Sequence, residues 1–122
     1  MNGDRSSGGR TFVLKHGAWH GGWCWRRVED LLRAQGRRAI VDAICTKQPY
    51  GALTGGLRLT GARERVPKKA YVLATGWANA AFPVFAEKVK DDPDWRYYEV
   101  ECGHDVMLDE PERLAQILQE AA

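Results

Sequence analysis

The sequence has no long apolar run, little net charge and only two serines. The first two of these features exclude whole classes of function. No apolar stretch approaches the ~20 residues that a membrane-spanning helix requires. A net charge of +2, with basic residues scattered among acidic neighbours, provides no patch for nucleic acid or an anionic membrane surface. Three widely spaced cysteines are an odd number and predict no disulfide framework. We therefore expect a cytoplasmic protein without nucleic-acid or membrane partners.

The length and composition fit one small domain. A chain of 122 residues with 44% hydrophobic and 28% charged residues is typical of a soluble globular protein. The first ten residues, MNGDRSSGGR, are polar and small, and we interpret 1–10 as a disordered or expression-derived tail. Residues 11–122 are then predicted to form a single domain.

Strand-like and helix-like patterns alternate along the chain. Short β-branched or aromatic runs predict strands at 11–15, 39–44, 70–75 and 95–101. Amphipathic stretches predict helices at 25–36, 82–92 and 111–122. The first helix is expected to stop at Gly36, and the second to turn Val84, Phe85 and Val89 inward. Between 45 and 69 the chain is rich in Gly, Pro and Thr and shows no regular period.

This alternation predicts an α/β fold with a parallel sheet and right-handed crossovers. Ligands of such sheets bind at the carboxyl ends of the strands. Two loops are expected there: HGAWHGG at 16–22, after the first strand, and CGHDVML at 102–108, after the last. The first offers free backbone N–H groups just before a helix, which suits a developing oxyanion, and the second offers a histidine.

Three stretches resemble a known family. FVLKHGAWHGGWCWRRVEDLLRAQG (12–36) resembles the opening of α/β-hydrolase-fold esterases, in the branch with plant hydroxynitrile lyases, methylesterases and related bacterial esterases. WRYYEVECGHDVMLDEPERLAQILQEA (95–121) resembles the C-terminal end of that family, and LRLTGARERVPKKAYVLAT (57–75) resembles the segment before its penultimate strand. The resemblance implies a reduced, internally truncated α/β-hydrolase-like three-layer sandwich with a small, mostly parallel sheet. It also implies a relation to carboxylic ester hydrolases and no cofactor.

The resemblance carries roles to particular positions. The backbone N–H of Ala18 would form half of an oxyanion hole, and Trp19 and His20 would line the mouth of the pocket. His104 matches the general base, which would take a proton from the nucleophile and return it to the leaving group. Asp105 also matches the motif, but no role follows for it.

The nucleophile of the family is missing. Its G-x-S-x-G elbow occurs nowhere, and the only serines, Ser6 and Ser7, lie in the predicted tail. The acid that usually follows the penultimate strand has no match either, because ATGWANAAF (74–82) contains no Asp or Glu. The chain is similar to the two ends of a hydrolase without its middle, so we expect it to be inactive or very weak.

Two other functions remain open. One is weak, His104-dependent hydrolysis of activated esters, with water, a partner chain's groups or Cys45 as the nucleophile. Cys45 ends a predicted strand, as a nucleophile would, but ICTKQP lacks the flanking glycines of an elbow and a buried, inert thiol is favoured. The other function is non-catalytic: binding of a small ester-like molecule, or assembly.

Spacing also raises a metal site and a dimer. His16, His20 and Cys24 recur every four residues, but the glycines between them argue against helical spacing, and no metal is expected. In the related family the nucleophile strand would pair with the strand at 11–15. Without it one strand edge stays open, and open edges pair with other chains, so we expect a homodimer through that edge or strand exchange between chains.

Overall fold

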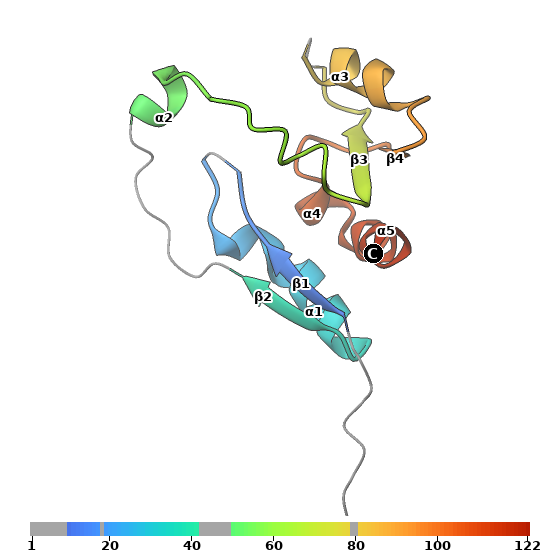
Figure 1. Cartoon of the computed structure of the whole chain (residues 1–122). Helices are drawn as coiled ribbons and strands as arrows, with labels where there is room; N and C mark the ends of the chain where they lie inside the picture. Colours follow the sequence, from blue (N-terminus) through green and yellow to red (C-terminus); the bar gives the residue numbers. More distant parts are fainter. Residues whose placement is uncertain (1–9, 18, 42–49, 79–80) are drawn as a thin grey trace, which may run out of the picture.

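The structure, a computed structural model, describes residues 10–17, 19–41, 50–78 and 81–122. The elements alternate in type along the chain, as the sequence predicted (Figure 1). The four strands are β1 (Thr11–Leu14), β2 (Arg38–Val41), β3 (Lys69–Ala74) and β4 (Trp95–Val100). The helical elements are the 3₁₀ turn η1 (Gly22–Trp25), α1 (Arg26–Ala34), α2 (Gly51–Thr54), α3 (Ala81–Val89), α4 (Val106–Asp109) and α5 (Pro111–Ala121).

All strand pairing in the described residues is parallel, which confirms the predicted α/β class. β1 pairs with β2 from Thr11↔Arg38 to Leu14↔Val41, and β3 pairs with β4 from Lys69↔Trp95 to Ala74↔Val100. The expectation of one small sheet is corrected, because the described strands form two separate two-stranded sheets. Each pair therefore keeps unpaired strand edges, which propensity and periodicity alone do not reveal.

The end of α1 explains how the chain turns back into β2. Gly36 adopts φ +73°, a left-handed conformation that glycine enters without steric cost. The Gly36 N–H donates to the Arg33 carbonyl at 3.0 Å, and the Arg37 N–H donates to the Leu32 carbonyl at 2.9 Å. This pair of bonds is the Schellman motif, which satisfies the last helical carbonyls. The predicted stop at Gly36 is thus confirmed.

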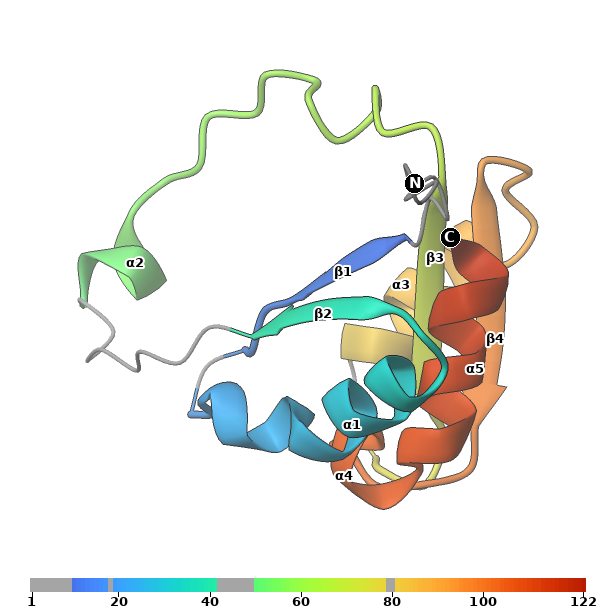
Figure 2. The same ribbon diagram turned by 90° about the horizontal axis from the view of Figure 1, so that it is seen from below.

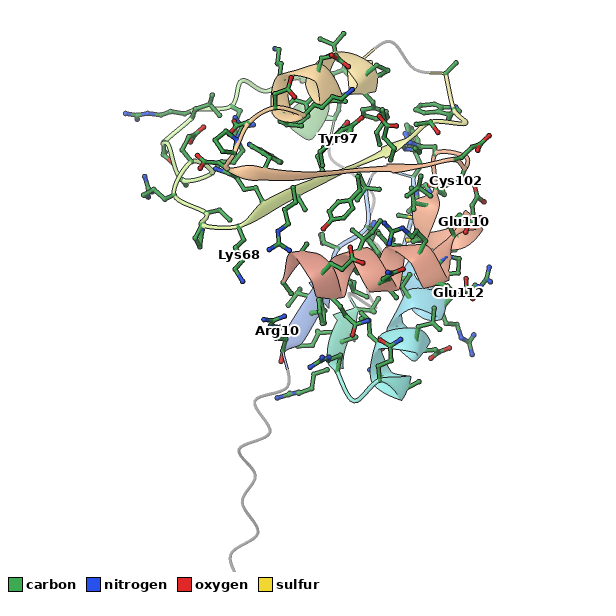
Figure 3. All side chains as sticks on the ribbon, turned by 90° about the vertical axis from the view of Figure 1, so that its right-hand side faces the viewer. Arg10, Lys68, Tyr97, Cys102, Glu110 and Glu112 are labelled. Carbon is green, nitrogen blue, oxygen red and sulfur yellow. The ribbon has the colours of Figure 1, made fainter. Side chains whose placement is uncertain are left out.

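One hydrophobic cluster joins the two sheets. Leu14 and Ala39 come from β1 and β2, and they share the cluster with Val100, which ends β4. The remaining buried members lie on helical elements: Val28, Leu32, Val106, Leu114, Ala115 and Ile117. Figure 3 shows α5 between the β3–β4 sheet and the layer of α1, β1 and β2. Leu14 ends β1 and Val100 ends β4, so the cluster brings the loops that follow these two strands close together.

The apolar faces of α3 and α5 follow the predictions only in part. On α5, Leu114 and Ile117 are buried, as expected of an amphipathic helix, and Pro111 occupies the first turn, where its missing N–H costs nothing. On α3, Val89 is buried but Val84 is 59% exposed, so its inward assignment was wrong. Ala86 is the other buried residue of α3.

Residues 50–68, which precede the second sheet, contribute no residue to the core cluster. The structure adds the single turn α2 to the region that was predicted to be irregular, and residues 55–68 contain no helix or strand. Leu57 and Leu59 are more than four-fifths exposed. Figures 1 and 2 both show α2 standing away from the rest of the chain. Among the described residues no helix is both long and apolar enough to cross a membrane.

Candidate functional site

His104 lies on the short turn between β4 and α4, beside a hollow of about 200 Å³. The hollow is lined by one run of β3 and by three side chains from later in the chain: Tyr71, Val72, Leu73, Ala74, Phe82, His104 and Val106. Successive side chains of a strand point to opposite faces, so four consecutive lining residues place the hollow along an edge of β3. Among the described strands β3 pairs with β4 alone, which leaves that edge without a described strand partner.

Gly76 brings the turn after β3 against the end of β4. Its N–H donates to the Cys102 carbonyl at 3.0 Å, and a Cβ at this position would lie 2.6 Å from the same oxygen. The Thr75 N–H donates to the Val100 carbonyl at 2.9 Å, which continues the ladder past the strand. Only a residue without a side chain fits this approach, and it places Trp77 beside His104.

Two aromatic rings pack against the His104 imidazole. The ring centroid of Trp77 lies 4.4 Å from that of His104, and Phe82 stacks on the imidazole at 5.4 Å with an interplanar angle of 4°. Trp77 and Phe82 also contact each other at 5.7 Å. Such aromatic contacts contribute about 0.5–1.5 kcal/mol each beyond burial. His104 is exposed to solvent, so the two rings fix its position without removing it from water.

Tyr71 forms a polar point in an otherwise largely apolar wall. Its hydroxyl donates to the Phe82 carbonyl at 3.3 Å, which links β3 to the start of α3. Burial raises the pKa of Tyr71 above its ordinary value, so the phenol is neutral at physiological pH. Because its proton goes to the Phe82 carbonyl, the phenol oxygen has only acceptor capacity left for other partners.

A thiol lies two residues before His104, but its environment makes it a poor nucleophile. Burial raises the pKa of Cys102, and the nearby carboxylates of Asp109 and Glu110 raise it further. Figure 3 shows Cys102 and Glu110 at the same end of the molecule. The Cys102 thiol donates to the Gly103 carbonyl at 3.3 Å, which also favours the neutral form. Since the thiolate is the nucleophilic form, these contacts disfavour Cys102 as a nucleophile.

The loop after β1 reaches the same turn through His20. The His20 Nε2 lies 2.9 Å from the Asp105 Oδ1, and the imidazole stacks on Trp23 at 5.5 Å. Trp19 is 95% exposed with φ +68°, a backbone conformation that non-glycine residues rarely adopt. Neither His20 nor Trp19 is among the residues that line the hollow. The pocket-mouth assignment of both stays a prediction.

Two predicted site residues, Ala18 and Cys45, lie outside the described residues. Within the described ranges, no three His, Cys, Asp or Glu side chains gather as a metal site would require. The sequence did not single out Trp77, Phe82 or the role of Asp105. All three depend on contacts between distant segments, although Asp105 stands next to the predicted base.

Comparison with known proteins gives partial matches to esterases. The chain is 35% identical over 82 residues to a carbendazim hydrolyzing esterase of Nocardioides sp. (strain SG-4G), covering 67% of this chain and 34% of that protein. It is 59% identical over 32 residues to the probable esterase PIR7A of Oryza sativa subsp. indica, covering 26% of this chain and 12% of the other. Over 27 residues it is 63% identical to methylesterase 2 of Arabidopsis thaliana, covering 22% and 10%.

These matches establish a relation to esterases, and therefore to a hydrolase family. The chain spans about a third of the first of these relatives and about a tenth of the other two. No protein-family model matches the chain, and no solved structure matches it.

Proposed function

We propose that this chain is a reduced relative of carboxylic ester hydrolases that keeps part of an esterase site but carries out no serine-based acyl transfer. The observation that carries the proposal is the arrangement of His104, packed against Trp77 and Phe82 at the rim of an apolar hollow. A histidine in this position can accept the proton of a nucleophile in the hollow. The sequence offers no serine for that task, because Ser6 and Ser7 precede the first strand.

The chemistry of an ester hydrolase explains why the loss of serine matters. A serine hydroxyl would attack the ester carbonyl carbon, the histidine would accept its proton, and backbone N–H groups would stabilise the oxyanion. Here His104 would supply the base and Ala18 the oxyanion donor, as the family resemblance implies. The hollow then binds an ester-like molecule, and no acyl-enzyme on serine forms.

The accessibility of His104 favours a second candidate function, slow hydrolysis by water. In this reaction a water molecule attacks the carbonyl carbon while the imidazole accepts one of its protons. The intermediate then collapses and expels the alcohol or phenolate. Acid–base assistance of this kind contributes about 10²–10⁴-fold, which is enough to detect with an activated ester. His104 is exposed and borders the hollow, so a water molecule can reach it.

Hydrolysis of p-nitrophenyl acetate tests both functions. We compare the protein with His104→Ala, with Cys45→Ala and with an equal concentration of free imidazole. The proposal predicts equal rates for the protein and His104→Ala. A rate that falls at least about tenfold in His104→Ala, against the 10²–10⁴-fold scale of such catalysis, would establish the second function. A rate lost in Cys45→Ala as well would identify that thiol as the nucleophile, and would contradict the proposal.

A further inference from the structure

One contact between distant segments near the site involves a residue to which the sequence assigned no role. Asp105 follows His104 directly, and its Oδ1 lies 2.9 Å from the His20 Nε2. His20 belongs to the loop after β1, whereas Asp105 belongs to the turn after β4, so the pair joins the two loops that the sequence placed at the candidate site. We propose that Asp105 is a positioning residue, which holds the loop after β1 against the His104 turn through His20.

The burial of the pair gives this contact more weight than an ordinary surface ion pair has. The His20 side chain is 19% exposed and the Asp105 side chain is 33% exposed. Partial burial strengthens a hydrogen bond to a carboxylate, because less water competes for its oxygens. Trp23 stacks on the imidazole at 5.5 Å with an interplanar angle of 17°, which restricts the ring before it meets the carboxylate. The freedom lost on forming the bond is correspondingly smaller.

The rest of the loop shows why such a contact is needed. Its later part is anchored by Cys24, which is 1% exposed, and by the bond from the Cys24 N–H to the Gly21 carbonyl. In its earlier part, Gly17 and Trp19 are exposed. His20 lies between these two parts. The contact with Asp105 therefore sets where the loop begins to approach the turn.

A second connection between the same regions serves a different segment. The Arg27 Nη1 donates to the Leu108 carbonyl at 2.9 Å, and its Nη2 lies 3.8 Å from the Glu112 Oε1. These contacts join α1 to α4 and α5, at residues that follow the His104 turn in the sequence. Arg27 thus offers a matched comparison. Its removal breaks a bond between α1 and the C-terminal helices α4 and α5, and it leaves the His20–Asp105 pair in place.

The identification of these loops with an esterase site rests on the proposed function, but the positioning role is tested without any substrate. Amide hydrogen exchange measures how often each loop opens. We compare the protein with Asp105→Ala, His20→Ala, the double variant, His20→Gln and Arg27→Ala. Exchange along α5 serves as the control for global unfolding in every variant.

The expected pattern is specific to a joining contact. Asp105→Ala and His20→Ala should each raise exchange of residues 19–23 and 103–106 by about three- to tenfold, the effect of a partly buried charge-assisted bond. The double variant should exceed neither single variant by more than about twofold, because both remove the same bond. His20→Gln retains a donor and should stay within about twofold of the original protein. Arg27→Ala should leave residues 19–20 unchanged.

Two results would overturn the inference. One is faster exchange in 103–106 alone after Asp105→Ala, which would confine the carboxylate to its own turn. The other is additive effects in the double variant, which would mean that the two side chains act independently. Either result is separable from failure of the proposed function, because ester turnover does not enter the measurement.

Discussion

Leu32 joins the first half of the described chain (β1, α1 and β2) to the second half (β3 to α5) through the shared hydrophobic cluster. Its truncation measures how strongly the stability of one half depends on the other. Leu32 lies on α1 with a fully buried side chain, in the same cluster as Ile117 of α5. A Leu→Ala change at such a position costs about 2–5 kcal/mol, from lost burial and from the cavity left behind. A chain of this size has a total unfolding free energy of about 6–15 kcal/mol, so the variant should still fold.

Urea denaturation turns this cost into a shift that can be measured. With a dependence on urea of about 2 kcal/mol per molar, the midpoint should fall by about 1–2.5 M. Trp25 packs against the core from the first half, and Trp95 reports on the β3–β4 sheet. Versions of the protein in which only one of these tryptophans fluoresces should show the same reduced midpoint after Leu32→Ala.

The matched control is Leu57→Ala, the same chemical change at a side chain that is 84% exposed. It should alter stability by no more than about 0.5 kcal/mol. The reasoning is refuted if Leu32→Ala lowers the midpoint seen by Trp25 and leaves that seen by Trp95 unchanged. The two sheets would then unfold separately, and the prediction of a single domain at 11–122 would fail.

Three further outcomes are expected. Gly76→Ala should lower the thermal midpoint in a melting experiment by several degrees, because the new Cβ would lie 2.6 Å from a backbone oxygen; an unchanged midpoint would contradict this packing. Since burial and the Asp109 carboxylate raise the pKa of the Cys102 thiol, its alkylation, followed by peptide mass spectrometry, should require higher pH than that of an exposed thiol. Asp109→Asn should shift that dependence to lower pH, and no shift would remove Asp109 as a cause. The protein should form a dimer in light scattering, because Val13 and Ile40 are neighbours across β1–β2 and are 74% and 50% exposed. A monodisperse monomer would contradict the dimer, and Val13→Lys should weaken it.

The sequence predicted the local elements because local signals determine them. The end of α1 was predicted from Gly36, and the structure shows why: the left-handed residue closes two backbone bonds there. The predicted helix at 111–122 begins with Pro111, and α5 begins there because proline fits an N-terminal helical position. The parallel direction of the strands follows from the helical crossovers between them. Each of these features needs only a few neighbouring residues.

The arrangement in space was harder to predict because it depends on contacts between distant residues. The division into two sheets depends on which strand edges meet, and a strand pattern does not specify its partner. Val84 has the spacing of an inward residue, yet Ala86 and Val89 form the face that α3 buries. At the site, a motif identified His104, whereas the aromatic neighbours and the His20–Asp105 pair required the folded chain.

Covalent labelling with a fluorophosphonate tests the central claim most directly, because this reagent forms a stable adduct with an activated serine. Intact-mass measurement of the protein and of His104→Ala shows whether one adduct forms per chain. The account predicts that both remain unmodified, since no serine lies near His104 in the sequence or along the described hollow. A single adduct on Ser6 or Ser7 that disappears in His104→Ala would show a working serine–histidine pair, and would contradict the account.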